Sequence, residues 1–401
     1  FLKSVFKEAR SNHTLEWARR SDGTLADTPE EVGELVRTKF EQWFKSVVPV
    51  NERWGSNGWD RMMTGDTSQM SPIKYNIAPG CDMTHADFVQ ECYIDPHLWE
   101  KAEEENWWGG ILDPITPTEI EDALDNSKKG TAPGESQVTI DMLKDLQGAG
   151  EILSPMFNEF LSDRRIPDEM NTAILRLLPK TEAGLSDLDK TRPIALMETL
   201  CKLYERVIIT RVTSALHHHQ VLDEGQYGAL PEAGTAPPLR VLTEVLDDAR
   251  VTGSELHLLA LDLKKAFDTA EYWSQALSWQ ALGMPEDMIK VLINLDAGSN
   301  SPADDRPPLT QDSIGAATRV ILDAGRHTEP FVHGRGVRQG SVGGPIKWVV
   351  FMHFWLAWMK RTMTGKGYCM ARGGPDPTQT TLTQTQSLEL RAPPLPAHLL
   401  R

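Results

Sequence analysis

The sequence predicts an α+β fold, and three observations carry that prediction. The run from Thr172 to Leu178 is typical of a strand that stops at Pro179-Lys180, and a polar loop returns the chain to Arg192–Leu196, which predicts a β-hairpin. Leu256–Leu261 is a continuous apolar run of strand length. Around these segments apolar residues recur at helical spacing, so helices and strands are mixed along the chain.

Helix signals account for most of the remaining chain. Residues 1–50 are expected to form a helix, a turn at 19–23 and a second helix, because Thr28-Pro29-Glu30-Glu31 supplies an N-cap, a proline at the first helical position and an acidic first turn. Further helices are expected at 116–126, 140–146, 152–161, 200–212, 270–282, after Pro285 and at 346–359. Short paired strands are expected at Arg319–Leu322 and Pro330–Val332, and loops at 51–80 and 298–312.

Composition and charge bound the class of protein. The chain has 401 residues, of which 40% are apolar and 24% charged, and these ordinary values exclude a disordered chain, a collagen and a coiled-coil rod. The net charge of −16 argues at first against a nucleic-acid partner. Residues 1–125 hold 24 of the 57 acidic residues, however, so the remainder of the chain is free to present a basic cleft.

The four cysteines exclude a disulfide scaffold and indicate reduced thiols in an intracellular chain. Cys81, His85 and Cys92 lie close in sequence, but their spacing matches no zinc pattern, and we interpret them as loop and core residues.

The chain shows no secretory signal and no membrane span. Phe1 is not an initiator Met, so we expect the N-terminus to have been cut from something longer. The strongest apolar stretch, 346–359, is shorter than the roughly 20 residues that a bilayer needs, and Lys347 and His353 interrupt it, so a buried helix is expected there. From Arg372 onward the composition indicates a disordered tail or out-of-frame translation.

Asp262 follows the apolar run directly. An acid at the end of a buried strand is costly to bury unless something pairs with it, and a divalent cation such as Mg²⁺ is one such partner. A helix cap or a turn residue is the alternative interpretation.

Gly334–Pro345 holds five glycines around one Gln and two Arg, and a helix begins directly after it. Such a backbone approaches a ligand closely, and the helix N-terminus favours phosphate. An ordinary Gly-rich turn is the alternative.

Lys180 and Arg192 lie one on each arm of the expected hairpin, where two cations could clamp a triphosphate. The alternative interpretation is that both are ordinary solvated surface charges.

Taken in order, these features resemble a known family. The chain shows a basic A-P-G loop, an L-L-P-K strand, R-P-I-A-L, Q-Y-G, L-D-L-K-K-A-F-D and then G-V-R-Q-G. Over residues 110–365 this order resembles the reverse transcriptases of non-LTR (LINE-type) retrotransposons. The resemblance implies a right-hand polymerase fold with a helical and loop linker at 1–109, fingers at 110–250, a partial palm at 251–370 and the tail at 371–401.

The resemblance also implies roles for individual residues. Asp262 matches the first metal-binding, catalytic carboxylate, and Leu263 matches the residue whose carbonyl helps to hold metal. Asp268 matches a structural position. The implied nucleotide-binding residues are Lys180, Arg192, Phe267, Gln339 and Gly340, and the implied nucleic-acid-binding residues are Lys128, Lys129, Gln226, Tyr227, Gly228 and Arg338.

The implied partners are an RNA template, a DNA primer and deoxynucleoside triphosphates, with two Mg²⁺ ions and no membrane. An endonuclease is expected upstream in a parent polyprotein, and the compartment is nuclear or cytoplasmic.

The chain departs from the family in three places. The aromatic-x-Asp-Asp hairpin expected after the Gln-Gly loop and its helix is missing, as is the thumb, and Asp304-Asp305 lies before the loop without flanking strands. Ser341–Pro345 stands where D-P-L-S-P is usual.

Two hypotheses follow: a truncated polymerase domain that is inactive alone, or a non-catalytic module that binds RNA or protein. A maturase-like protein is a weaker third.

Overall fold

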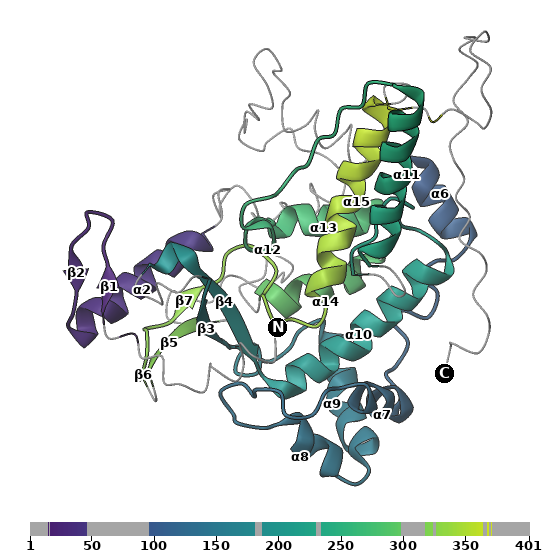
Figure 1. Ribbon diagram of the computed structural model, residues 1–401. Coiled ribbons are helices and arrows are strands. Elements are labelled where there is room, and N and C mark those ends of the chain that lie inside the picture. The colour runs from purple at the N-terminus through teal and green to yellow at the C-terminus, as the bar shows by residue number, and fades with distance from the viewer. Residues whose placement is uncertain are drawn as a thin grey trace, which may run out of the picture.

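A computed structural model describes residues 15, 17–45, 96–180, 187–229, 234–297, 317–323, 326–363, 367, 368 and 370 (Figure 1). The helices are α2 Pro29–Trp43, α6 Pro96–Glu104, α7 Pro117–Asp125, α8 Ile140–Asp145, α9 Ala149–Asp163, α10 Thr199–His218, α11 Ala236–Thr252, α12 Ala266–Thr269, α13 Tyr272–Ala281, α14 Glu286–Ala297 and α15 Gly344–Thr362, with a 3₁₀ turn at Leu188–Lys190. The strands are β1 Ala18–Arg19, β2 Leu25–Ala26, β3 Ala173–Pro179, β4 Thr191–Met197, β5 Ala317–Asp323, β6 Arg326–His327 and β7 Phe331–Val332.

The expected hairpin and the expected short strands share one mixed sheet. β3 and β4 pair antiparallel, with Leu178 opposite Arg192, which confirms the hairpin. β5 lies parallel to β3 and antiparallel to β7, so the predicted pairing of the later strands is also confirmed. The strand order is β4-β3-β5-β6, with β7 paired to β5. This sheet brings the chain before residue 332 against the hairpin and sets the position of the loop that follows.

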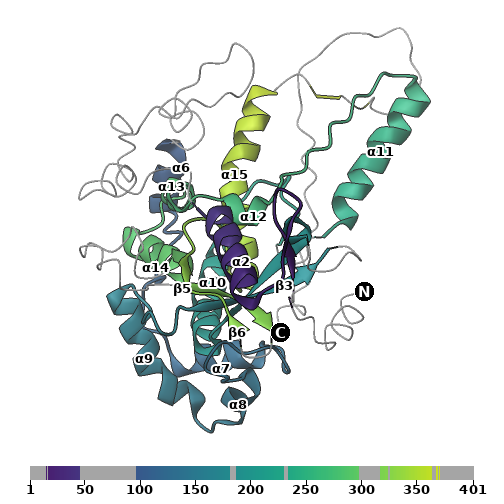
Figure 2. The same cartoon turned by 90° about the vertical axis from the view of Figure 1, so that its left-hand side faces the viewer.

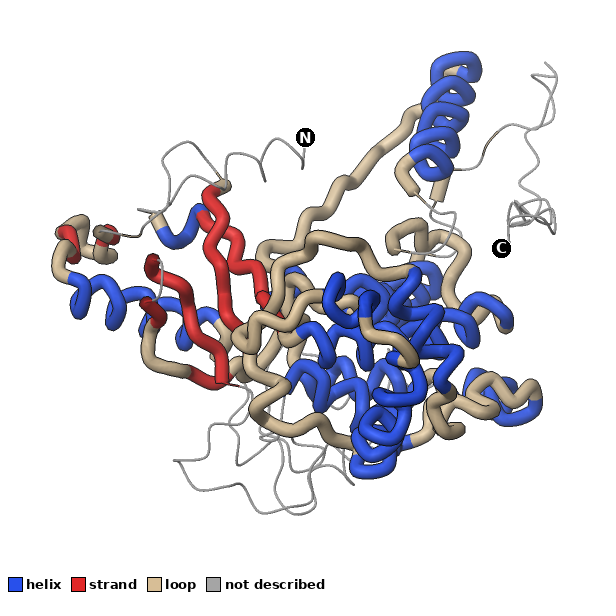
Figure 3. The backbone as a smooth tube through the Cα atoms, turned by 90° about the horizontal axis from the view of Figure 1, so that it is seen from below, coloured by secondary structure: helices blue, strands red, loops and turns tan. Residues whose placement is uncertain are grey.

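The expected strand at Leu256–Leu261 is wrong. Residues 254–263 form no hydrogen-bonded pairing with any described strand, and they make the long connection between α11 and α12 that is seen in Figure 3. A strand needs a partner for its backbone N–H and C=O groups, and none of the described strands lies beside this run. Its leucines are therefore exposed, Leu259 to 80%.

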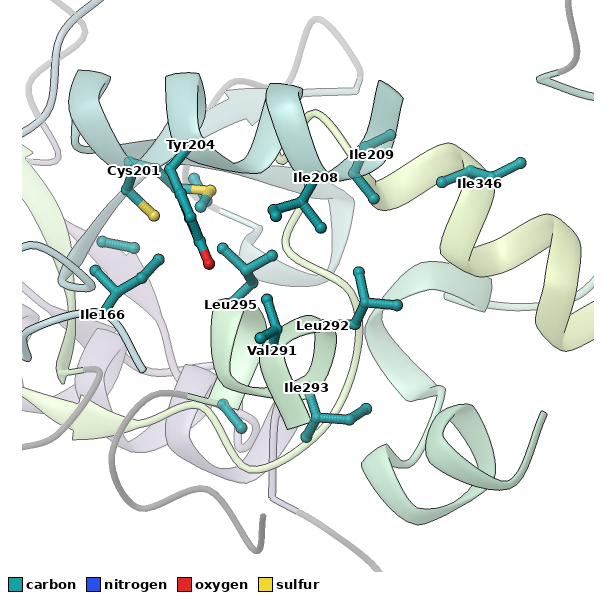
Figure 4. Close-up of a cluster of buried hydrophobic side chains, with 14 of the residues drawn as sticks. Ile166, Cys201, Tyr204, Ile208, Ile209, Val291, Leu292, Ile293, Leu295 and Ile346 are labelled. Atoms are coloured by element: carbon teal, nitrogen blue, oxygen red, sulfur yellow. The ribbon is translucent and has the colours of Figure 1, made fainter. Parts of the chain in front are cut away.

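The hydrophobic core forms around α14, which the sequence predicted after Pro285. Every residue from Met288 to Ala297 is buried, as expected for a helix surrounded by other elements. Figure 4 shows side chains of α10 and α14 facing one another, with Ile346 of α15 and Ile166 beside them. Tyr204 packs edge-to-face on two phenylalanines of α9, with centroids 5.4 and 5.6 Å apart.

The N-terminal helix α2 begins as predicted, with the Thr28 hydroxyl accepting from the Glu31 N–H. The turn at 19–23 is also confirmed, but it joins β1 to β2 rather than a helix to α2. The backbone N–H of Leu15 donates to the Leu322 carbonyl, so this segment runs beside β5. Figure 2 shows α2 near the middle of the molecule, in front of α10 and α15.

Helix α11 stands apart from the packed helices, as Figures 2 and 3 show. Its buried hydrophobic residue is Ala249, and five of its leucine and valine side chains face solvent over more than a third of their area: Leu239, Val241, Leu242, Leu246 and Val251. In the part of the chain that is described, no helix combines the length and the apolarity that crossing a membrane requires.

The predictions for 51–80, 298–312, Cys81, His85, Cys92, Asp304-Asp305 and the tail fall outside the described residues.

Candidate active site

The Gly-rich loop at 334–343 packs directly on the segment that carries the F-D pair. The Gly336 N–H donates to the Ala270 carbonyl, and the Val337 N–H donates to the Phe267 carbonyl, each at 2.7 Å. Gly336 has φ +94°, and a Cβ there would lie 2.8 Å from the Asp268 carbonyl oxygen. A glycine is needed at this close approach. The loop is therefore built around residues 267–270.

Gln339 and Gly340 connect the same loop to the hairpin. The Ala195 N–H of β4 donates to the Gln339 carbonyl at 2.6 Å. The Gln339 side chain donates from Nε2 to Oδ1 of Asp268 at 2.7 Å. Gly340 has φ +125°, and a Cβ on it would collide with the Ala195 carbonyl oxygen. Two predicted site residues are thus held in one place by β4 and Asp268.

Asp268 is the buried centre of these contacts. Its second oxygen accepts from the indole N–H of Trp43 at 3.2 Å, so both carboxylate oxygens have a donor. Burial raises the pKa of Asp268, against the lowering effect of the two hydrogen bonds and of the nearby Lys265 and Lys180 charges. The assignment of Asp268 to a structural role agrees with this arrangement.

The hairpin presents its cations on one face. Residues 176, 178 and 180 lie on the face of β3 opposite to that of the buried residues 173, 175 and 177, and Leu178 pairs with Arg192. Both Lys180 and Arg192 are exposed, and the Lys180 charge acts on Asp268. The structure therefore brings the predicted triphosphate cations to the side of the molecule where the Gly-rich loop meets β4.

Two further lysines and one tryptophan lie here that sequence reasoning missed. Lys39 Nζ lies 2.8 Å from Oδ2 of Asp189, in the turn between β3 and β4, and Lys265 Nζ lies 4.0 Å from its other oxygen. The Lys265 ammonium also lies 2.9 Å from the centroid of the Trp43 ring. The K-K pair before A-F-D was a visible signal for Lys265, whereas nothing local marked Lys39 or Trp43.

The C-terminal end of the loop is held by a buried charge cluster. Glu205 of α10 accepts from the Ser341 hydroxyl at 2.5 Å and from the Val342 N–H at 2.9 Å. Lys347 of α15 reaches Glu205 at 3.1 Å and Asp296 of α14 at 2.7 Å, and all three side chains are at most 1% exposed. Sequence reasoning saw Lys347 only as an interruption of an apolar helix.

The protonation states of this cluster follow from burial and mutual attraction. Burial opposes ionisation of Glu205, yet the Lys347 ammonium and the two hydrogen bonds from the loop hold its pKa below the ordinary value. Burial raises the pKa of Asp296, and the two carboxylates together raise that of Lys347 in spite of its own burial. Glu205 lies at the N-terminus of α15, the position at which phosphate was expected. The helix dipole stabilises a carboxylate there in the same way as it would stabilise a phosphate.

Arg338 corrects a prediction. It was expected to contact nucleic acid, but its side chain is buried and its Nη1 donates to the backbone carbonyl and side-chain oxygen of Asn171, at 3.1 and 2.8 Å. Alternation within the loop turns Arg338 inward while Gln339 stays partly exposed. Its role is to anchor the loop to the start of β3.

Phe267 is half-buried and stacks on Trp348 of α15, with ring centroids 5.3 Å apart and planes at 28°. Trp348 in turn contacts Phe351 at 5.2 Å. This aromatic row fixes Phe267 beside the loop.

The predicted metal ligands are not brought together with other carboxylates. Asp262 and Leu263 are exposed in the extended run 254–263. Among the described residues no group of three or more His, Cys, Asp and Glu side chains converges. These residues alone do not fit a two-metal centre. An adjacent acid pair that sequence reasoning overlooked, Asp247-Asp248, lies on helix α11 and not on a hairpin.

The remaining predicted residues lie on loops. Lys128 and Lys129 are exposed between α7 and α8. Gln226, Tyr227 and Gly228 lie in the connection from α10 to α11, which contacts α15 because the Asp223 N–H donates to Nδ1 of His353 at 3.1 Å.

Comparison with known proteins relates the segment that contains the Gly-rich loop to a known family. The family described as "Reverse transcriptase (RNA-dependent DNA polymerase)" matches residues 178–371. Residues 178–371 are a reverse transcriptase domain. The match contains the β4 strand, the F-D segment and the entire G-V-R-Q-G loop, so the contacts among these three parts lie within this domain, whereas Lys39, Trp43 and Asn171 precede it.

Relatives of the reverse transcriptase domain come from mobile elements. The chain is 27% identical over 246 residues to "RNA-directed DNA polymerase from mobile element jockey" of Drosophila funebris, covering 60% of this chain and 24% of that protein. The jockey polymerase of Drosophila melanogaster is 26% identical over 355 residues, 88% of this chain and 34% of the relative. The type-1 R2 Pol polyprotein of Nasonia vitripennis is 24% identical over 293 residues, 73% of this chain and 25% of the relative. The chain thus spans between 24 and 34% of the length of these relatives.

Proposed function

We propose that this chain contributes to an RNA-directed DNA polymerase, which joins a deoxynucleotide to the 3′-hydroxyl of a DNA primer. The 3′-oxygen forms a bond to the α-phosphorus, the bond to the bridging oxygen breaks, pyrophosphate leaves and the hydroxyl proton passes to solvent. The observation that carries the proposal is the packing of the G-V-R-Q-G loop on residues 267–270 and on β4, inside the segment that matches the family.

The residues of the chain bind and orient the nucleotide. Lys180 and Arg192, exposed on the hairpin, neutralise the triphosphate, and Gln339 with Gly340 presents backbone to the nucleotide and to the template base. Phe267 packs under the sugar. Lys128, Lys129 and the segment 226–228 contact the RNA template as exposed loop residues.

Divalent metal ions are general in this family, and Mg²⁺ is the ion proposed here. Asp262 and the Leu263 carbonyl are the proposed ligands, and the described residues do not complete the site, so no step is derived through the metal. We propose that the 401-residue chain alone does not extend a primer. A parent polyprotein with an upstream endonuclease, intracellular and either nuclear or cytoplasmic, is part of the same proposal.

Nucleotide and template binding test the proposal separately from synthesis. The chain is expected to bind an RNA–DNA primer–template and a deoxynucleoside triphosphate, and Gln339→Ala should weaken nucleotide binding by about tenfold because it removes a contact of the loop. Gln137→Ala, on an exposed loop near α8, is the control. Failure to bind either ligand at low salt would overturn the proposal.

Primer extension tests the expected inactivity. Mg²⁺-dependent extension by the 401-residue chain that Asp262→Ala abolishes would confirm the polymerase and refute the inactivity.

A second candidate function is a non-catalytic module that binds RNA. The observation that favours it is the contrast between the fully bonded loop around Gln339 and the exposed run that holds Asp262. This function predicts RNA binding that falls steeply with salt and is unchanged in Asp262→Ala.

A further inference from the structure

The last two turns of α2 touch three separate parts of the candidate site. Lys39 pairs with Asp189 in the turn between β3 and β4. The Trp43 carbonyl accepts from Nη2 of Arg335 at 3.2 Å, and the Phe44 carbonyl accepts from the Gly334 N–H at 3.1 Å. The end of α2 therefore contacts the hairpin and the first residues of the Gly-rich loop at once.

Trp43 adds the third contact, to the F-D segment. Its side chain is only 6% exposed, and its indole N–H donates to Oδ2 of Asp268 at 3.2 Å. Its ring lies under the Lys265 ammonium, an arrangement in which a cation is attracted to the face of the aromatic ring. Trp43 thereby touches both ends of the short K-A-F-D stretch.

One carboxylate joins α2 to the loop. Oδ1 of Asp268 accepts from the Gln339 side chain at 2.7 Å, and Oδ2 accepts from Trp43. A carboxylate with one donor is free to turn about its last side-chain bond, whereas donors on both oxygens fix its orientation. The orientation of Asp268 decides where the Gln339 side chain and the backbone beyond it lie.

We propose that Trp43 is a positioning residue of the nucleotide site, which holds Asp268 so that Asp268 holds Gln339 and the G-V-R-Q-G loop. The proposal rests on the proposed function for the role of Gln339, and it adds the N-terminal segment to the working polymerase. Trp43 lies outside residues 178–371, so a residue that precedes the domain helps to fix the conformation of a loop within it.

Trp43→Phe tests this proposal because it keeps an aromatic ring and removes the N–H, and the cavity that the smaller ring leaves is matched by the control. Trp108→Phe is a matched control: Trp108 is 7% exposed, and its indole donates to the Leu282 carbonyl at 2.8 Å, away from the loop. Both variants lose one buried indole hydrogen bond.

Amide hydrogen exchange reads out the loop directly. In Trp43→Phe the exchange of the Gly336 and Val337 amides should rise by about tenfold, while amides of α10 and α14 stay as in the unaltered chain. Trp108→Phe should leave the loop amides unchanged. Unchanged loop exchange in Trp43→Phe, or an equal rise throughout α10 and α14, would overturn the positioning role.

Nucleotide affinity separates this proposal from the proposed function. With dGTP as the probe, Trp43→Phe should weaken binding by about fivefold, and Gln339→Ala combined with it should add little further loss, because both act through Asp268. Weakening by Gln339→Ala but not by Trp43→Phe would overturn the positioning role. Faster exchange of the loop amides in Trp43→Phe, with a dGTP affinity that is unchanged in both Trp43→Phe and Gln339→Ala, would confirm the contact between α2 and the loop. The same result would overturn the nucleotide site.

Discussion

Lys347→Met is the sharpest test of how the loop is anchored. Methionine has an unbranched side chain one atom shorter than that of lysine, and it leaves Glu205 and Asp296 at most 1% exposed and without their shared cation. Removing one partner of a buried ion pair typically costs about 3–5 kcal/mol, because the remaining charge stays buried and uncompensated. The expected loss in free energy of unfolding is therefore about 3–5 kcal/mol.

Urea denaturation followed by circular dichroism measures this loss. Lys360→Met on the same helix is the control: Lys360 is 60% exposed and pairs with Asp223 at 2.8 Å, so its loss should stay below about 1 kcal/mol. Without Lys347 the folded pKa values of the two buried carboxyls rise above their unfolded values. Protonation then favours the folded state, so the deficit of the variant should shrink as the pH falls from 8 to 5. A loss under about 1 kcal/mol that does not vary with pH would refute the reasoning.

Three further substitutions test separate parts of the structure. Gly340→Ala should lower the free energy of unfolding by about 2 kcal/mol or more and loosen the loop, because φ is positive there and the new methyl group would meet the Ala195 carbonyl oxygen. Thermal denaturation measures this loss, and an unchanged midpoint would contradict the prediction. The Arg211 guanidinium holds the pKa of Glu119 at about 2, so Glu119→Gln should lower the stability of the fold at pH 7 by about 1 kcal/mol. The unaltered chain should lose the same stabilisation as the pH falls from 4.5 towards 2, because Glu119 is then protonated. Leu259→Ser should improve solubility in sedimentation assays and change stability by less than about 0.5 kcal/mol, and a large destabilisation would show that this exposed leucine is a core residue.

The parts of the fold that sequence predicted well are those whose signals are local. Thr116 and Glu119 form the reciprocal capping box that a Thr-Pro-Thr-Glu start favours, and α7 begins there. The hairpin β3–β4 was visible in its alternation and its polar turn, and Gly283 ends the helix before α14 in the left-handed conformation that glycine adopts readily. Each of these depends on residues within a few positions of one another.

The parts that sequence could not predict depend on distant residues. Trp43 and Asp268 are 225 positions apart, and Lys347 and Glu205 are 142 positions apart, so no local pattern could pair them. The run 256–261 has the composition of a buried strand, but strand formation also needs a neighbour, which composition does not reveal. Arg338 was assigned to nucleic acid from the family resemblance, and only the position of Asn171 shows that it points inward.

The contacts of the loop also explain how a glycine-rich segment keeps one conformation. Glycines lose more backbone freedom on folding than other residues, so a loop with four of them needs several independent attachments. Asp268 holds it on one side, Ala195 holds its middle, and Glu205 holds its end, and these residues belong to three different elements. A loop fixed in this way does not need to be reordered when a nucleotide arrives, and preorganised backbone is what stabilises charge most effectively. Because α2 supplies the second donor to Asp268, part of the order of this loop comes from residues outside 178–371.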